Sequence, residues 1–261
     1  MDYWQKQDDK PLFADIVWNK PEQKTHAGKL AIVGGNKLSF AAVARSFAFA
    51  EGFGAGQVKA LVPDALKPVL PHGAGIVFAP SNHSGGLGRE AQHTLDAVND
   101  WANVTVLIGD LGKNSETEIL IENFVARQPG RLVITRDSVD LLAHNTNALL
   151  ERDNTVLIAT FAQLQKLFKN AYYNKIITFS MTLSTLVETL HKFTITYPVT
   201  VATVHQDTAV VAHSGQVTTT PLSKTGYSPL TIWSGEAAIK AALYFLWNPS
   251  KSLEAVTTSL L

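Results

Sequence analysis

The chain has 261 residues, of which 46% are hydrophobic and 17% are charged, and its 22 basic residues balance its 22 acidic ones. This composition is typical of a folded globular protein and excludes a disordered one. Zero net charge provides no basic field for nucleic acid or for an anionic membrane, so neither is expected as a partner. The absence of cysteine excludes disulfides, thiolate nucleophiles and cysteine-based zinc sites.

The first residues are polar and acidic, which is not the pattern of a signal peptide, and no apolar run is long enough to span a bilayer. A cytoplasmic protein is therefore expected. Residues 1–27 are expected to form an N-terminal arm with a short helix around residues 13–18. Residues 28–261 are expected to form a single domain. The eight histidines show no metal-binding spacing, and no metal ligand is assigned.

The clearest unit of the sequence lies between residues 29 and 63. Residues 30–33 are a continuous apolar run that predicts a strand buried on both faces. Gly34 and Gly35 then begin a turn, residues 40–53 predict a helix, and residues 58–62 predict the next strand. This is a βαβ unit, the building block of a parallel sheet. A glycine turn that leads into a helix N-terminus is also a natural place for a phosphate group. Small residues form one face of the helix: Ala42, Ser46 and Ala50.

Strands and helices alternate along the rest of the chain, without a linker or an internal repeat, which indicates one doubly wound α/β domain. Further strands are predicted at 75–79, 105–108, 131–135, 155–159, 199–202 and 209–212. Further helices are predicted at 64–71, 90–101, 116–127, 137–144, 161–169, 181–192 and from near Ser234 to Trp247. Residues 218–231 are expected to form a loop. The two strands at 199–202 and 209–212 are expected to form a hairpin-like end of the sheet.

The segments HAGKLAIVGGN (residues 26–36) and FAAVARSFAFAEGFGAGQVKALVPD (residues 40–64) resemble the opening of the ADP/ATP-dependent NAD(P)H-hydrate dehydratases, a branch of the ribokinase-like superfamily. That family typically has a His-Lys-Gly start, a Gly-Gly-Ser turn, a Gly-Ala-Ala helix start and a Gly-Ala-Gly helix end. Those places hold His26, Gly28, Gly34-Gly35-Asn36, Ala41-Ala42 and Gly54-Ala55-Gly56. The resemblance implies a three-layer α/β/α sandwich with a mostly parallel central sheet, assembled as a homotetramer.

The resemblance continues in order towards the C-terminus. Residues 108–112 stand where the family has Gly-Pro-Gly-Leu-Gly, with Asp110 in the place of a glycine. Residues 135–142 correspond to an Asp-Ala-Asp-Ala-Leu-Asn-Leu-Leu segment. By this correspondence Glu236 stands at the place of the catalytic base. The substrate-binding places are Ala42, Gly112, Asp137 and Thr160, and the nucleotide-binding places are His205, Gln206, Asp207, Thr208, Ser234 and Gly235.

The chemistry that the resemblance implies is that of a carbon–oxygen lyase. ADP or ATP, with Mg²⁺, phosphorylates the ring hydroxyl of hydrated NAD(P)H, and elimination of phosphate restores the dinucleotide. Such a reaction needs backbone N–H groups at a helix N-terminus for the transferring phosphate, and a carboxylate that accepts the hydroxyl proton. The implied partner is thus a small molecule, an NAD(P)H hydrate or a related nucleotide.

Three motifs depart from the family pattern. The Gly-Gly-Thr-Gly-Asp of the last helix start becomes residues 232–236, Ile-Trp-Ser-Gly-Glu, so that bulky side chains replace two glycines. The Thr-Pro-His-Pro-Gly-Glu loop becomes residues 158–163, and the Leu-Lys-Gly strand end becomes residues 203–205. Three interpretations follow: a dehydratase of the hydrate-repair type, a catalytically silent relative that binds a nucleotide or metabolite or serves as an assembly partner, and a small-molecule kinase.

Considered without the resemblance, the same residues have structural interpretations. Glu236 is a favourable acid at a helix start, and Asp137 is a candidate N-cap. Ala42 and Gly112 are small residues that either line a pocket or permit tight packing between helix and strand. His205 is expected to be a histidine with an ordinary hydrogen-bond partner.

Overall fold

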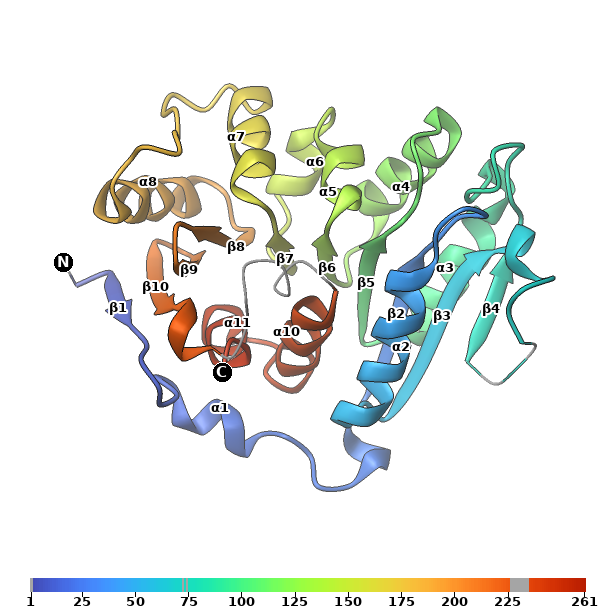
Figure 1. The fold of residues 1–261 in the computed structure, drawn as a ribbon, viewed down its shortest axis with the longest axis horizontal. Coiled ribbons are helices and arrows are strands. Elements are labelled where there is room, and N and C mark those ends of the chain that lie inside the picture. The colour runs from blue at the N-terminus through green and yellow to red at the C-terminus, as the bar shows by residue number, and fades with distance from the viewer. Residues whose placement is uncertain (1, 72, 74, 226–234) are drawn as a thin grey trace.

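The computed structural model describes residues 2–71, 73, 75–225 and 235–261. Their strands form one ten-stranded sheet in the order β1-β10-β9-β8-β7-β6-β5-β2-β3-β4 (Figure 1). All neighbouring strands are parallel except β9, which runs antiparallel to both β8 and β10. The strands are β1 (Trp4–Lys6), β2 (Lys29–Gly34), β3 (Gln57–Pro63), β4 (Ile76–Ala79), β5 (Val104–Gly109), β6 (Arg131–Thr135), β7 (Thr155–Ile158), β8 (Thr200–His205), β9 (Thr208–His213) and β10 (Gln216–Pro221).

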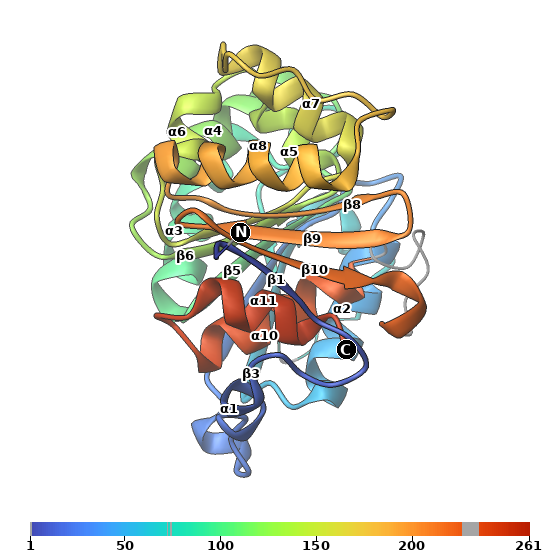
Figure 2. The same cartoon turned by 90° about the vertical axis from the view of Figure 1, so that its left-hand side faces the viewer.

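Helices cover both faces of this sheet, as Figure 2 shows, so the molecule has three layers. The helices on one face are α3 (Gln92–Trp101), α4 (Ser115–Arg127), α5 (Asp137–Leu142), α6 (Thr146–Leu150), α7 (Phe161–Asn170) and α8 (Leu183–Thr196). The helices on the other face are α1 (Ala14–Trp18), α2 (Ala41–Phe53), α10 (Glu236–Trp247) and α11 (Ser252–Ser259). Each face carries its own hydrophobic core. The α/β/α architecture with a mostly parallel sheet agrees with the sequence prediction.

The central strands β2 and β5 are buried at every position except Lys29 at the start of β2, because helices cover both faces, and most of their residues are apolar. From β2 the chain proceeds to β3 and β4 on one side, and it then returns to β5 on the other side of β2. The carboxyl ends of β2 and β5 therefore diverge to opposite sides. In open α/β sheets such a switch point is where ligands bind.

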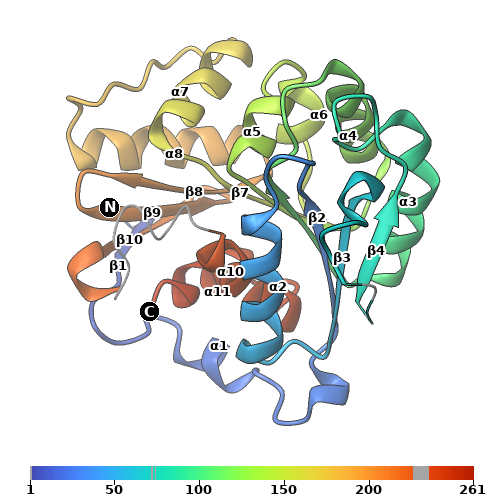
Figure 3. The same ribbon diagram turned by 45° about the vertical axis from the view of Figure 1, so that its right-hand side comes forward.

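Helix α2 packs closely against α10 (Figure 3). The predicted small-residue face is buried at this contact: Ala42, Ser46 and Ala50 are at most 1% exposed. Small side chains let two helix backbones approach, which places the N-terminus of α10 above the centre of the sheet. Gly54 ends α2 in a left-handed conformation, with φ of 118°, that favours glycine.

The N-terminal segment contacts strand β10 and then the helix α11. Strand β1 adds to the sheet beside β10, and α1 contacts α11. The Lys251 ammonium lies 2.5 Å from the Asp15 carboxylate, and the Asn19 amide donates to Asn248 Oδ1 at 2.6 Å. The short helix expected around residues 13–18 is α1, whereas β1 was not predicted.

Several local predictions need correction. Residues 216–221 form strand β10, where the sequence predicted a loop from 218 onwards, because Thr218, Thr219 and Thr220 are buried between β9, β1 and α11. Helices α6 and α11 were not predicted. The helix predicted at 64–71 is only a short 3₁₀ turn, Asp64–Leu66. The Asp64 carboxylate accepts the Ser81 N–H at 3.0 Å instead of capping a helix. No helix among the described residues has the length and apolar character to cross a membrane.

Candidate functional site

The candidate site lies at the carboxyl ends of β2, β5 and β6, where glycine brings the chains close together. A Cβ added at Gly34 would lie 2.3 Å from the Gly109 carbonyl oxygen, and one at Gly109 would lie 2.2 Å from Asp137 Oδ1. Neither position therefore accepts a larger residue without movement of its neighbours. The glycines let the β2 and β5 ends, and the start of α5, meet in one place.

Asp110 is the centre of a hydrogen-bonded network at this place. Its carboxylate accepts the Ala42 N–H at the start of α2 (3.2 Å) and lies 2.7 Å from Nη2 of Arg136. Its own N–H donates to Asp137 Oδ1 at 2.8 Å, and its carbonyl accepts the Asn36 amide at 2.6 Å. The Asp110 side chain is 11% exposed, so this carboxylate is a fixed anion at the N-terminus of α2.

Two residues of this network have a left-handed backbone, with φ of 57° at Asp110 and 56° at Arg136. Non-glycine residues rarely adopt this conformation, and their strain of about 1–3 kcal/mol each is characteristic of functional sites. Asp110 occupies a position where the resemblance places a glycine, and its backbone conformation gives the physical reason for that glycine.

Asp137 is the first residue of α5 but does not cap it, because Arg136 is the N-cap residue and the Asp137 carboxylate turns towards β5. There it accepts the N–H groups of Asp110 (2.8 Å) and Leu111 (3.1 Å). The N-cap interpretation of Asp137 is therefore wrong. The carboxylate fixes the loop that follows β5 and links it to β6.

Beside this network lies a cleft of about 440 Å³, which we call the carboxyl-edge cleft. Gly112 and Asp137, both predicted to bind substrate, line it together. Two of its bases face acids: Lys166 Nζ lies 3.6 Å from Asp140 and His144 Nε2 lies 4.0 Å from Glu118. The complete lining is Gly112, Lys113, Glu118, Asp137, Asp140, Leu141, His144 and Lys166.

Thr160, the fourth predicted substrate residue, is the N-cap of α7 and joins the network through a neighbour. Its hydroxyl accepts the Gln163 backbone N–H at 3.2 Å, and the side-chain Oε1 of Gln163 accepts the Thr160 N–H at 3.0 Å, which is a capping box. The Gln163 amide also donates to the Arg136 carbonyl (2.8 Å) and to Asp140 (2.7 Å). Hydrogen bonds thus connect Ala42, Asp137 and Thr160 through Asp110, Arg136 and Gln163, whereas Gly112 is related to them only as a neighbour of Asp137 in the cleft lining.

The N-terminus of α10 differs from that of α2 because no described side chain caps it. Gly235 is its N-cap with φ of 102°, and half-buried Glu236 is its first residue. A Cβ on Gly235 would lie 2.9 Å from the Ser46 hydroxyl, which is buried and has no hydrogen-bond partner among the described residues. Ser234, together with Ile232 and Trp233, lies outside the described residues.

The remaining predicted nucleotide residues form the β8–β9 hairpin. His205 is 2% exposed; its Nε2 lies 2.9 Å from the Met181 carbonyl and its ring stacks on Phe161 with centroids 4.8 Å apart. The imidazole is thus a partnered core group. Gln206 and Asp207 form the exposed turn, and Thr208 begins β9.

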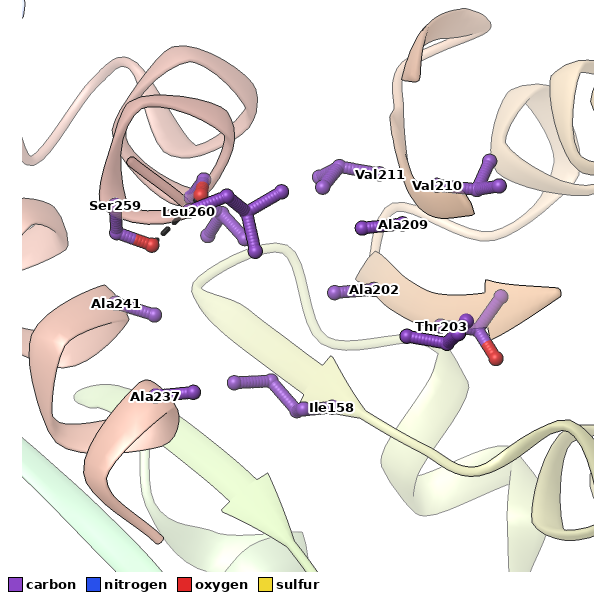
Figure 4. A pocket seen from close by; sticks show the side chains of 12 residues that line it. Ile158, Ala202, Thr203, Ala209, Val210, Val211, Ala237, Ala241, Ser259 and Leu260 are labelled. Carbon is purple, nitrogen blue, oxygen red and sulfur yellow. Dashed lines mark hydrogen bonds between the residues drawn. The ribbon is translucent and has the colours of Figure 1, made fainter. Parts of the chain in front are cut away.

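Next to this hairpin, α10 and α11 close over the sheet. Figure 4 shows Ala237 and Ile158 facing each other across the gap, with Ala202 and Val211 on the sheet side. The gap, which we call the α10 cavity, has a volume of only about 20 Å³ and an almost wholly apolar lining. That is space for about one water molecule and not for a nucleotide base.

Comparison with solved structures gives matches over nearly the whole chain. A protein from Enterococcus faecalis described as belonging to the ribokinase-like superfamily superposes with a TM-score of 0.70 at 14% identity, covering 98% of this chain and 85% of that one. The ADP/ATP-dependent NAD(P)H-hydrate dehydratase of Bacillus subtilis, co-crystallised with ATP and Mg²⁺ and soaked with CoA, gives 0.56 at 12% identity, covering 95% and 85%. The pyridoxal kinase of Bacillus subtilis, in complex with ADP, gives 0.52 at 10% identity, covering 89% and 88%. This chain has a ribokinase-like fold.

No family model matches the sequence, and no curated protein matches it. The structural matches therefore establish the ribokinase-like fold. Their sequence identities of 10–14% establish nothing beyond the fold. The fold places the α10 N-terminus and the β2–β5 switch point on the same edge of the sheet.

The Mg²⁺ implied by the resemblance finds no dedicated protein site in the part of this ribokinase-like chain that the structure describes. No three histidine, aspartate or glutamate side chains gather there in a way that could hold a metal ion. Asp110 and Asp137 are already engaged by Arg136 and by backbone N–H groups. These residues do not fit a metal centre, and no reaction step is derived through one.

Four residues of the site were not predicted from the sequence: Arg136, Lys113, His144 and Lys166. Arg136 directly follows a predicted strand and precedes Asp137, so its position at the carboxyl end of a parallel strand was a usable signal. The other three lie on helices or loops whose orientation only the tertiary structure sets.

Proposed function

We propose that this protein is an NAD(P)H-hydrate dehydratase-like protein, with Glu236 as the carboxylate that accepts the ring-hydroxyl proton. In this proposal the α10 N-terminus holds the transferring phosphate, and the carboxyl-edge cleft holds part of the hydrated dinucleotide. As the bond between the ring oxygen and the terminal phosphorus forms, the bond from that phosphorus to the nucleotide breaks, AMP or ADP leaves, and the hydroxyl proton passes to Glu236. Phosphate then departs with the electrons of its carbon–oxygen bond, and loss of a proton from the neighbouring ring carbon restores the double bond of the dinucleotide.

The observation that carries the proposal is the uncapped N-terminus of α10. The N–H groups of the first turn of a helix have no partner within the helix and attract anions. At α10 no described side chain accepts from them, Glu236 stands beside them, and the unpartnered Ser46 hydroxyl lies under Gly235. At α2, by contrast, Asp110 already occupies the N-terminus.

The proposal is tested with the full chain, hydrated NADH or NADPH, and ADP or ATP with Mg²⁺. We expect the absorbance of the reduced nicotinamide to reappear with wild type and to fall by about 100-fold or more in rate with Glu236→Gln, as for removal of a general base. Glu151→Gln, which makes the same change at an exposed acid outside the proposed site, is the matched control and should keep the rate. Absence of turnover in wild type would contradict the proposal.

A second candidate function is a catalytically silent relative that binds a metabolite in the carboxyl-edge cleft. It is favoured by the α10 cavity, which is about 20 Å³, and by the burial of His205 in the core. Both leave little room for a base beside the predicted nucleotide residues. Thermal stabilisation by the hydrated dinucleotide without turnover would support this candidate. Consumption of nucleotide only in the presence of an added alcohol would instead indicate a kinase.

A further inference from the structure

The opposite edge of the sheet carries a second cleft that the proposed function does not use. It lies at the amino ends of the neighbouring strands β3, β2 and β5 and has a volume of about 290 Å³. We call it the amino-edge cleft. Its lining is Lys24, Thr25, His26, Gly28, Lys29, Gly56, Gln57 and Asn103. His26 and Gly28 belong to the opening motif that the sequence singled out.

The lining of this cleft has one sign of charge. Lys24, His26 and Lys29 contribute cationic or protonatable groups, and no acidic residue lines the cleft. None of the three side chains forms an ion pair with a described residue, whereas Lys166 and His144 in the carboxyl-edge cleft both face acids. In a chain with zero net charge, this is a local excess of positive charge in a concave site, which attracts anions.

The cleft is preformed because hydrogen bonds from the backbone N–H groups of its lining residues tie its walls together. The Gln57 N–H donates to the Gly28 carbonyl (3.0 Å), the Lys29 N–H to Asn103 Oδ1 (2.9 Å), and the Asn103 N–H to the Lys29 carbonyl (2.9 Å). A Cβ on Gly56 would lie 2.5 Å from the Gly28 carbonyl oxygen and 2.6 Å from that of Lys24. The Gly56 backbone therefore packs directly against these two chains and joins the walls at the base of the cleft.

Helix capping does not account for these cations. The carboxyl end of α2 points to this edge, and lysines often stabilise such ends. Here, however, the N–H groups of Gly54 and Ala55 both donate to the Ala50 carbonyl and close the helix themselves. The Lys29 ammonium lies 5.7 Å from the ring centroid of Trp101, a contact that leaves its charge without a counterion.

We propose that the amino-edge cleft binds a small molecule through a phosphoryl group, held by Lys24, His26 and Lys29. Lysine binds phosphate as a point charge and several together suit a multiply charged anion. A volume of about 290 Å³ is at the small end of ligand pockets, so the ligand is a small phosphorylated compound or the phosphate end of a nucleotide. This site is separate from the one proposed for turnover.

The test is titration of the full chain with inorganic pyrophosphate at low salt, followed by calorimetry and by amide NMR spectra. We expect shifts at Gly28, Lys29, Gln57 and Asn103. We also expect the Kd for pyrophosphate to rise by about tenfold or more in Lys24→Gln/Lys29→Gln, because charge-assisted contacts to the phosphoryl oxygens contribute strongly to affinity. Lys10→Gln/Lys169→Gln, which removes two exposed charges elsewhere, is the matched control and should bind as wild type does. If the double variant fails to fold, Lys24→Glu alone tests the same site on an exposed side chain.

Three outcomes would overturn the proposal: no shifts at the amino-edge amides, shifts only around Gly112 and Lys113, or equal affinity in Lys24→Gln/Lys29→Gln and the control. Equal or tighter binding of citrate would overturn the phosphoryl assignment. A parallel titration with ADP distinguishes the sources, because a nucleotide ligand shifts the same amides at a lower concentration than pyrophosphate does. Turnover of hydrated NADH is measured separately, so failure here leaves the proposed function testable.

Discussion

The carboxyl-edge cleft and the α10 cavity lie on the same fold but have opposite character. The cleft is open and polar, about 440 Å³, and is bordered by a network with two strained residues. The cavity is closed and apolar, about 20 Å³, and is lined mainly by alanine, valine, isoleucine and leucine side chains. On the other face of the sheet at the same hairpin, His205 is buried and partnered. The difference indicates that one edge of this ribokinase-like fold leaves a solvent-open cleft, whereas the region next to the β8–β9 hairpin is packed with core side chains.

The largest expected effect on stability comes from Asp137→Ala, which removes the carboxylate that fixes the loop beside the carboxyl-edge cleft. The substitution leaves the N–H groups of Asp110 and Leu111 without their acceptor. Because hydrogen bonds to a charged group contribute about 1.5–3 kcal/mol each, we expect a loss of roughly 3 kcal/mol in the free energy of unfolding. Urea denaturation measures it. Asp137→Asn keeps one acceptor oxygen and should lose less; equal losses would show that the carboxylate charge is unimportant.

His205→Ala tests the closed region. Removing a buried ring that stacks on Phe161 should lower the free energy of unfolding by roughly 2–3 kcal/mol, as for other large-to-small core changes. Binding of hydrated NADH should be unchanged. The matched control is Asp207→Ala in the exposed turn, for which denaturation should show a change within about 0.5 kcal/mol. A His205→Ala protein that is as stable as wild type but no longer binds the ligand would show that His205 is a binding residue and not a core residue.

Asp110→Gly should raise the affinity of the α2 N-terminus, beside the carboxyl-edge cleft, for anions. It removes the carboxylate from the α2 N-terminus, frees the Ala42 N–H and the Arg136 guanidinium, and relieves a left-handed non-glycine backbone. We expect pyrophosphate to bind about tenfold more tightly at this edge, equivalent to about 1.4 kcal/mol. Calorimetry in the Lys24→Gln/Lys29→Gln background excludes the amino-edge cleft. Unchanged affinity in both Asp110→Gly and Asp110→Asn would show that Asp110 does not compete with anions.

The smallest effect is a pH dependence on the closed side. His213 lies on β9 under α11, bonded to the Thr200 hydroxyl at 3.1 Å, and burial lowers the pKa of its ring below the ordinary value of 6.5. The unfolded chain therefore binds the proton more readily. His213 thus contributes stability that is complete above about pH 6.5 and decreases as the pH falls towards its folded pKa. Denaturation of wild type and His213→Asn between about pH 7.5 and 5.5 measures this; parallel curves would contradict it.

The predicted strands were recovered well because each is a short apolar run that the sheet buries on both faces, as residues 30–33 and 105–108 illustrate. Strands β1 and β10 escaped prediction since their threonines, glutamine and lysine resemble loop residues. Only pairing with each other and burial against α11 makes them strands. In the candidate site, Gly112 and Asp137 were found through a motif. Lys113, His144 and Lys166 became visible only when α4, α5 and α7 were placed around them.

The sequence by itself determined the layered α/β architecture, because alternating buried strands and amphipathic helices have few other ways to cover their apolar surfaces. It also determined where the chain must turn tightly, through glycines such as Gly34 and Gly109. Only the tertiary structure decided that Asp110, and not a ligand, occupies the α2 N-terminus, and that the α10 N-terminus has no described side-chain cap. That outcome depends on residues more than 60 positions apart in the sequence, such as the Ala42 N–H and the Asp110 carboxylate, and no local pattern specifies such a contact.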